Sequence, residues 1–248
     1  MPPTRGRYAL FLGFPDLVYN QGMPRTINGR QFQWQLLEQV GKGDAGEVLR
    51  VQAQPGSLTA LMKRPVQNAS GGTILRQAVQ IENEGQILAS LKGLDASRNG
   101  LLVHTPLLLD QSIPGTSQTA SLFIVSEEVP GVAISSLLKQ RLQEDVSLSH
   151  VLVLRVLSGL FLLLERAHAF GIAWNDVKME HIFWDETNGK LSFIDWGNGL
   201  FLSAQPPTNG QDPAWLDYQQ FISEGNLLLN QIAPELIAEL DWPASAAQ

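Results

Sequence analysis

The sequence predicts an α+β protein of two lobes, the first rich in strands and the second mostly helical. Three observations predict this class. Short stretches of alternating apolar and polar residues follow one another from residue 33 to residue 63, as in antiparallel strands. The amphipathic segment 76–92 comes next and is typical of a helix. A long apolar segment, 147–170, then precedes a hairpin pattern around Asn188-Gly189, a dipeptide typical of two-residue turns.

Each expected element follows from its own pattern. Strands of the first lobe are expected at residues 33–40, 47–53, 58–63, 101–110 and 120–125. The segment 147–170 is apolar nearly all round, which predicts a helix buried in the middle of the second lobe. The hairpin strands are expected at 182–184 and 191–194. We expect three divisions of the chain, namely an arm rich in Pro, Gly and Asn (1–30), the first lobe (31–130) and the second (131–248).

Composition bounds the class of protein. The chain has 248 residues, 44% hydrophobic and 17% charged, so it can bury a core. Its formal net charge of −7 argues against a broad nucleic-acid-binding surface, which needs a basic excess. The absence of cysteine excludes disulfides and thiolate chemistry. The apolar run 151–164 contains Arg155 and is shorter than the roughly 20 residues of a membrane span. A cytoplasmic protein that does not cross a membrane is therefore expected.

One glycine-rich segment predicts a phosphate cradle. Residues 41–48 read GKGDAGEV and match the pattern GxGxxGxV, in which glycines let backbone N–H groups approach phosphates. A strand follows the segment, whereas a dinucleotide-binding loop opens a helix. A lone loop of this kind is more often a tight turn, and that alternative stays open here. The residues expected to contact a nucleotide are Gly41, Lys42, Gly43, Gly46 and Val48.

Two aspartates stand nineteen residues apart in the second lobe, Asp176 in AWNDVKMEH and Asp195 in IDWG. Upstream, Lys63 lies seventeen residues after Gly46. In this order the pieces supply what phosphoryl transfer from ATP requires: a cradle for the phosphates, a cation on them, an acid to hold the attacking hydroxyl and another to hold the metal. Seen alone, each residue is as readily a surface charge.

These motifs, at these spacings, resemble those of the protein kinase superfamily over about residues 30–200. The segment ALMK, which ends at Lys63, stands where kinases carry their lysine-bearing strand, and ENEGQILASL resembles the helix that supplies the glutamate partner of that lysine. Glu84 is the expected partner, with Glu82 as the alternative. The resemblance implies a bilobal protein-kinase-like fold with a strand-rich N-lobe, a reduced helical C-lobe and ATP bound between them.

The resemblance also implies a role for each site residue. Asp176 would accept the proton of the substrate hydroxyl, and Lys178 would neutralise charge on the transferring phosphoryl group. Asp195 would bind the Mg²⁺ that bridges the phosphates. The segment FIVSEEVPG resembles the kinase hinge, so the carbonyl of Glu127 and the amide of Val129 would bind adenine.

Three features depart from the kinase pattern. Trp174-Asn175 replaces His-Arg before Asp176, so the arginine that would pair with a phosphorylated loop is missing. His181 stands where kinases have an asparagine that holds a second metal, and imidazole suits Mn²⁺ or Zn²⁺ better than Mg²⁺. The segment 233–235, Ala-Pro-Glu, resembles the end of a kinase activation segment, yet few residues follow it. The alternative is that Pro234 only starts a short helix.

The implied activity is that of a Ser/Thr-type protein kinase, which moves the γ-phosphoryl group of ATP to a protein hydroxyl with Mg²⁺, or Mn²⁺, as the metal. Two alternatives stay open. A pseudokinase would bind nucleotide or act as a scaffold without transfer, because of His181 and the missing helices. A small-molecule kinase of the aminoglycoside-phosphotransferase type is suggested by the sequence Ile-Asp-Trp around Asp195, although Lys178 counts against it. The expected partners are ATP and a protein substrate, and no nucleic acid.

Overall fold

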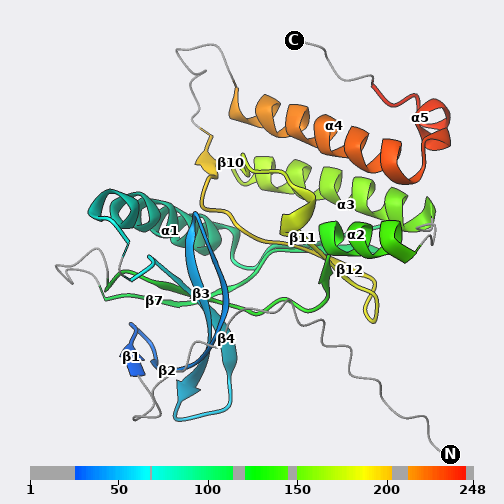
Figure 1. Cartoon of the computed structure of the whole chain (residues 1–248). Helices are drawn as coiled ribbons and strands as arrows, with labels where there is room; N and C mark the ends of the chain where they lie inside the picture. Colours follow the sequence, from blue (N-terminus) through cyan, green and yellow to red (C-terminus); the bar gives the residue numbers. More distant parts are fainter. Residues whose placement is uncertain (1–25, 68, 114–120, 145–149, 203–211, 244–248) are drawn as a thin grey trace, which may run out of the picture.

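The computed structural model describes residues 26–67, 69–113, 121–144, 150–202 and 212–243. The molecule has two lobes (Figure 1), with the long strands and helix α1 (Gly71–Leu91) in one and the remaining helices in the other. This arrangement confirms the predicted α+β class. Most of the expected arm, residues 1–25, lies outside the described residues.

The first lobe is built on one antiparallel six-stranded sheet. Its strands, in order across the sheet, are β1 (Thr26–Asn28), β2 (Gln33–Gly43), β3 (Gly46–Gln54), β4 (Thr59–Arg64), β8 (Ile124–Ser126) and β7 (Leu108–Gln111). Helix α1 packs on β4, β7 and β8, and the Oγ of Ser70 caps it by accepting the Thr73 N–H at 3.3 Å. Trp34 and Met62 are fully buried in the core of this lobe.

A second sheet of five strands lies in the other lobe. Its strands, in order, are β5 (Asp95–Arg98), β6 (Leu101–His104), β12 (Lys190–Phe193), β11 (Ile182–Asp185) and β9 (Val132–Ala133). The predicted hairpin is confirmed, since Asp185 pairs with Lys190 around Asn188-Gly189. The single strand expected at 101–110 is wrong, because Pro106 interrupts it. Residues 95–104, which we assigned to the first lobe, therefore pair with the second sheet, and the division at residue 130 stays a prediction.

The helices of the second lobe are α2 (Ile134–Glu144), α3 (His150–Ala169), α4 (Pro213–Ile232) and α5 (Glu235–Glu239). Short elements between them are β10 (Ile172–Ala173), the 3₁₀ turn η2 (Met179–His181) and β13 (Leu200–Phe201). The expected central helix is α3, whose buried face forms the largest core together with Trp174 and Phe193. Over the described residues, no helix has the length and apolar character needed to cross a membrane.

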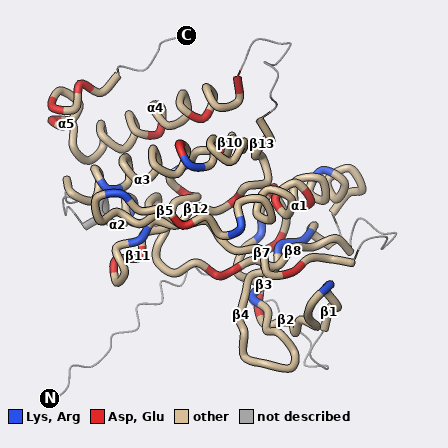
Figure 2. The backbone as a smooth tube through the Cα atoms, turned by 180° about the vertical axis from the view of Figure 1, so that it is seen from behind, with Lys and Arg blue, Asp and Glu red and all other residues tan. Residues whose placement is uncertain are grey.

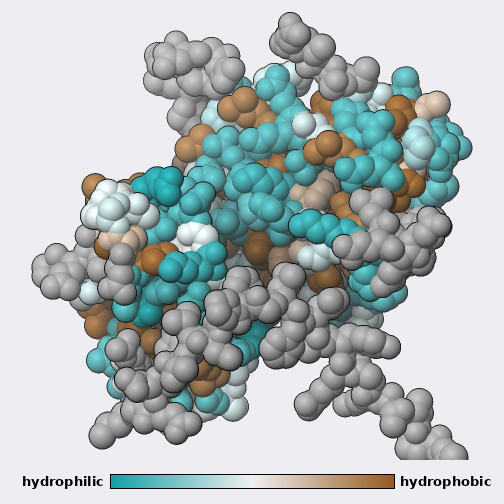
Figure 3. Space-filling model, in the orientation of Figure 1, coloured by the Kyte–Doolittle hydropathy of each residue, from teal (hydrophilic) through white to brown (hydrophobic). Residues whose placement is uncertain are grey.

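Basic and acidic residues both occur along the backbone of each lobe (Figure 2). In the face drawn in Figure 3, hydrophilic residues predominate and apolar residues form separate small patches. The larger apolar cluster runs from the second lobe into the first through α1 and β8, whereas the cluster around Trp34 and Met62 is confined to the sheet of the first lobe.

Candidate active site

A cavity of about 700 Å³ lies between the two lobes, and every site residue expected from the sequence lines it. The glycine-rich turn between β2 and β3 forms one wall, and the segment after β8 forms another. The predicted residues in its lining are Gly41, Lys42, Gly43, Gly46, Val48, Lys63, Glu84, Glu127, Val129, Asp176, Lys178, His181 and Asp195. These residues come from both lobes, so only the folded chain brings them together.

Lys63, on β4, joins two carboxylates. Its Nζ donates to Glu84 Oε2 at 2.7 Å and to Asp195 Oδ1 at 2.8 Å. Burial lowers the pKa of Lys63, but the charges of Glu84 and Asp195 outweigh burial and hold that pKa above its ordinary value. Burial raises the pKa of Asp195, and the charge of Lys63 outweighs it, so that pKa lies below its ordinary value. Glu84, rather than Glu82, is therefore the partner of Lys63.

Helix α1 also holds the segment that follows Asp195. The amide of Asn83 donates to the carbonyls of Gly197 at 3.0 Å and Gly199 at 2.8 Å. Glu84 Oε1 lies 3.4 Å from the backbone N–H of Trp196, on the other side of the same carboxylate that binds Lys63. The helix of the first lobe is thus fastened to the loop that positions Asp195 in the second.

The glycine-rich turn is shaped by two different roles of glycine. Gly46 has φ +126°, and a Cβ there would lie 2.5 Å from the carbonyl oxygen of Arg64, so only glycine is tolerated without movement. At Gly41 and Gly43 a Cβ would meet nothing within 4 Å, so these glycines leave open space beside the cavity. The turn is held from behind by Gln77, whose Nε2 donates to the Asp44 carbonyl at 3.1 Å.

Asp176, His181 and Asp195 form a group that can hold a metal ion, since one ligand atom from each lies within 4.8 Å of the others. The Nδ1 of His181 lies 3.1 Å from the backbone carbonyl of Asp176. A carbonyl only accepts, so Nδ1 is the donor in this contact, and a neutral ring would carry its lone pair on Nε2. That Nε2 lies 3.7 Å from Asp195 Oδ2. The mixed nitrogen and carboxylate donors suit Mn²⁺ better than Mg²⁺.

Lys178 pairs with Asp176, its Nζ lying 2.8 Å from Oδ1. The hydrogen bond to Asp176 raises the pKa of Lys178 above its ordinary value, so the amine is charged when the site is assembled. The other carboxylate oxygen of Asp176, Oδ2, faces His181 and lies 3.6 Å from Nδ1 of that ring.

The hinge segment is fixed by its neighbours. The Glu127 N–H donates to the Leu107 carbonyl at 2.9 Å, and the Glu127 carboxylate lies 3.0 Å from Nε2 of His104. Glu128 forms an ion pair with Arg50 of β3 at 2.6 Å. These contacts turn the Glu127 side chain toward β6, and Val129 lies in the wall of the cavity.

Sequence reasoning missed Asp217, a fully buried carboxylate on α4. Its Oδ2 accepts the Trp174 N–H at 2.8 Å and its Oδ1 accepts the Asn175 N–H at 2.5 Å, while the His168 ring contacts Oδ2 at 2.8 Å. Asp217 thereby fixes the chain just before Asp176, where Asn175 has φ +57°. An aspartate on the apolar side of a helix was the one available signal, because buried carboxylates need partners.

Two tryptophans pack behind Asp176 and Asp195. Trp174 and Trp196 are fully buried and stacked, with ring centroids 5.4 Å apart. The Trp174 Nε1 donates to the Asp195 carbonyl at 3.1 Å. The residue that replaces the kinase histidine therefore packs the Asp176 loop against the Asp195 loop.

The resemblance of residues 233–235 to the end of an activation segment is wrong. Helix α4, which carries Asp217 against the Asp176 loop, precedes these residues, and α5 begins directly after Pro234. Glu235 contacts His150 at 2.5 Å at the surface of α3. The alternative, that Pro234 starts a short helix, is therefore the one the structure bears out.

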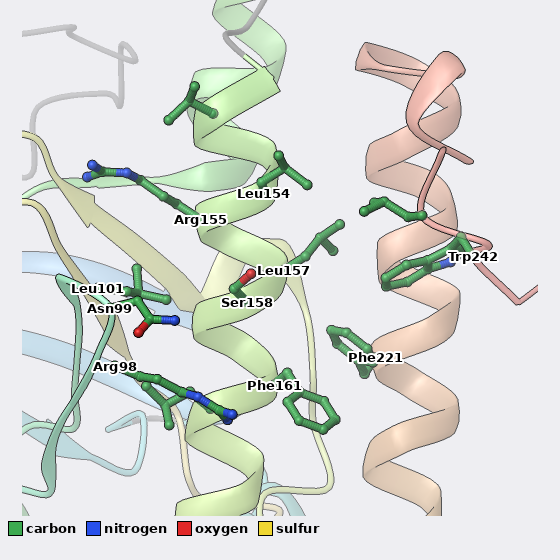
Figure 4. A pocket seen from close by; sticks show the side chains of 13 residues that line it. Arg98, Asn99, Leu101, Leu154, Arg155, Leu157, Ser158, Phe161, Phe221 and Trp242 are labelled. Atoms are coloured by element: carbon green, nitrogen blue, oxygen red, sulfur yellow. The ribbon is translucent and has the colours of Figure 1, made fainter. Parts of the chain in front are cut away.

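A second cavity of about 710 Å³ lies between α3, α4 and the β5–β6 turn (Figure 4). Phe161 and Phe221 face each other across it, with ring centroids 6.1 Å apart, and Trp242 packs beside Phe221. Arg98 lies at its edge. The predicted site residues lie in the other cavity, the cleft between the lobes.

The similarities to known proteins agree with this geometry. No protein-family model matches the chain. The serine/threonine-protein kinases PknD of Chlamydia trachomatis serovars D and A are each 26% identical to it over 188 residues, which make up 73% of this chain. The chain spans 18% of the length of these curated relatives.

The fold resembles that of a solved kinase. The crystal structure of the PknI kinase domain of Mycobacterium tuberculosis matches with a TM-score of 0.58 and 15% identity, covering 84% of this chain and 77% of that one. The fold is therefore protein-kinase-like. The chain is thus similar in fold to a solved kinase domain and, over 73% of its length, similar in sequence to PknD.

Proposed function

We propose that the chain is an ATP-dependent phosphotransferase of the Ser/Thr protein kinase type, which transfers the γ-phosphoryl group to a protein hydroxyl. One observation carries the proposal: Lys63, Glu84 and Asp195 form a connected ion-pair set that opens into the same cavity as Asp176 and Lys178. A purely structural cluster does not require this set beside a glycine-rich turn with open space at Gly41 and Gly43.

Each group then has a chemical task. Lys63, held by Glu84, binds phosphate oxygens, and the N–H groups of the turn at Gly41, Lys42, Gly43 and Gly46 approach the same phosphates. Val48 covers the nucleotide. The backbone of Glu127 and Val129 binds adenine. These assignments rest on the resemblance to kinases and on the shared lining of one cavity.

At the other end of the cavity, Asp176 orients the substrate hydroxyl and accepts its proton as the oxygen attacks. Lys178 offsets the charge that develops on the transferring group. Asp195 and His181 would hold a divalent ion, which would supply positive charge beside the phosphates. The neutral ring of His181 would offer its Nε2 lone pair for this, because Nδ1 donates to the Asp176 carbonyl.

The alternative is a pseudokinase, and His181 is the observation that favours it. If His181 excludes Mg²⁺, the cleft would bind nucleotide without turning it over. We propose in addition that the chain works in the cytoplasm, that its lobes run over residues 31–130 and 131–248, and that its partners are ATP and a protein substrate.

A transfer assay separates the two functions. The purified chain is incubated with radiolabelled ATP and either Mg²⁺ or Mn²⁺, with a generic basic protein and without one. We expect labelled protein, with more label in Mn²⁺, and a loss of about two to four powers of ten in Asp176→Asn, the range for a lost general base. We also expect His181→Asn to shift the metal preference toward Mg²⁺. ATP binding with no transfer in either metal would establish the pseudokinase instead.

A further inference from the structure

Helix α4 presents a row of polar side chains to the loop that carries Asp176 and Lys178. Asp217, Gln220 and Glu224 stand at positions i, i+3 and i+7, which lie on one face of an α-helix. Asp217 takes the N–H groups at the start of the loop, as described above. The two residues beyond it continue the same pattern along the loop.

Gln220 and Glu224 each bind one backbone N–H group. Gln220 Oε1 accepts the Val177 N–H at 2.9 Å, and Glu224 Oε2 accepts the Met179 N–H at 3.1 Å. The first of these contacts lies between Asp176 and Lys178, and the second directly follows Lys178. A carboxylate that accepts a backbone N–H makes a stronger, charge-assisted bond than a neutral amide does.

The spacing of these contacts follows from the shape of the loop. Lys178 has extended backbone, with φ −147° and ψ 144°. In extended chain, groups two residues apart point the same way and lie about 6.6 Å apart. Helix α4 advances only about 4.5 Å between residues 217 and 220 and about 6 Å between 220 and 224. The rise of α4 between residues 220 and 224 therefore nearly matches the extended chain between the N–H groups of Val177 and Met179.

Successive residues of the loop from 176 to 179 face alternately the cleft and the core of the second lobe. Val177 and Met179, whose N–H groups bind α4, have buried side chains that pack in the core of the second lobe. Asp176 and Lys178, the residues between, line the cleft. Holding the N–H groups of 177 and 179 therefore fixes the backbone on both sides of Lys178 and directly after Asp176.

We propose that Gln220 and Glu224 are positioning residues for phosphoryl transfer, an inference that rests on the proposed function. They touch neither nucleotide nor substrate, and they act by fixing the backbone from which Asp176 and Lys178 project. A displacement of about 1 Å in a reacting group can cost about a hundredfold in rate. The role is thus in the rate of the chemical step rather than in the binding of ATP.

The test compares Gln220→Ala and Glu224→Ala with two matched controls. Gln219→Ala removes an exposed glutamine from the same turn of α4, and Glu239→Ala removes an exposed glutamate from α5. We expect each test variant to lose about ten- to a hundredfold in kcat while KM for ATP stays within about twofold. The controls should match the wild type. Glu224→Gln keeps an acceptor oxygen and should recover most of the rate, which also covers the case in which Glu224→Ala folds poorly.

A second measurement does not depend on activity. Amide hydrogen exchange is followed by NMR in the full chain without nucleotide. The Val177 amide should exchange faster in Gln220→Ala, and the Met179 amide in Glu224→Ala, each without a change in Gln219→Ala. Mn²⁺ binding without nucleotide, followed by EPR, should weaken in both test variants, because Asp176 belongs with His181 and Asp195 to the group that can hold a metal ion and is then less well held.

The outcomes separate this inference from the proposed function. An active wild type whose kcat, amide exchange and Mn²⁺ affinity are unaffected by Gln220→Ala and Glu224→Ala would overturn the positioning role alone. A wild type that transfers no phosphate would overturn the proposed function. In that case, unchanged amide exchange at Val177 and Met179 in the test variants would overturn the inference as well. Faster amide exchange together with weaker Mn²⁺ binding would support the role of Gln220 and Glu224 in holding the loop.

Discussion

Lys63 stands between two carboxylates, and its charge lowers the pKa of Asp195 and opposes the burial that raises the pKa of Glu84. Lys63→Met retains the length of the side chain and removes the charge. We expect the thermal stabilisation by ATP with metal to disappear, because the phosphates lose their cation and meet Glu84 and Asp195 unscreened. The measurement is the ATP-induced shift in Tm. Lys139→Met, at an exposed site on α2, is the control. An undiminished shift in Lys63→Met would show that Lys63 does not bind the phosphates.

Asp195 gives the fold a dependence on pH. Its pKa is held below the ordinary value by Lys63, so its ionised form stabilises the folded state above the unfolded pKa of about 3.9. That stability is lost as the pH falls through the lower, folded pKa. We expect Tm of the wild type to fall more steeply than Tm of Asp195→Asn on acidification from about pH 5 to about pH 3. The exposed Asp241→Asn should follow the wild type, and parallel curves for all three proteins would contradict the assignment.

The glycine-rich turn shows how one element can use the same residue type for folding and for binding. Gly46→Ala puts a Cβ 2.5 Å from a backbone carbonyl at a φ of +126°. We expect a loss of roughly 1–3 kcal/mol in the free energy of unfolding, the usual cost of such a backbone position. Gly43→Ala meets nothing within 4 Å, so Tm should hold while affinity for ATP falls. Denaturant titration and nucleotide titration measure the two effects, and equal losses of stability in both variants would refute the distinction.

Elements whose pattern is local could be predicted from sequence. The β11–β12 hairpin depends on the Asn188-Gly189 turn between its strands, and α3 on its own apolar residues. Strand β6 could not be predicted correctly, because its parallel partner β12 lies far along the chain. Nothing near β6 in the sequence shows that it belongs to the second sheet and that the chain returns to the first sheet only after Pro106.

At the scale of the whole molecule, the same contrast divides the site. Lys63, Asp176 and Asp195 could be identified because each stands in a short motif at a fixed spacing from the next. Asp217 could not, because it contacts Asn175 across 42 residues and no motif surrounds it. Supporting residues such as Asp217 are recognised only from the packing of elements that are distant in sequence. The residues expected to react are recognised from short local motifs.

The two lobes are joined at the site by contacts from α1 to the loop after Asp195, and Asn83 makes two of them, to Gly197 and Gly199. Asn83→Ala removes both hydrogen bonds without touching Lys63 or its carboxylate partners. Each bond contributes about 1 kcal/mol, so we expect a small fall in Tm and a larger fall in phosphoryl transfer, roughly tenfold or more, because Asp195 is then held less firmly relative to Lys63. Initial rates and melting curves are compared with those of Gln86→Ala, an exposed change on the same helix. A variant that loses stability and rate in the same proportion as a generally destabilised protein would show that Asn83 supports the fold and not the alignment of the lobes.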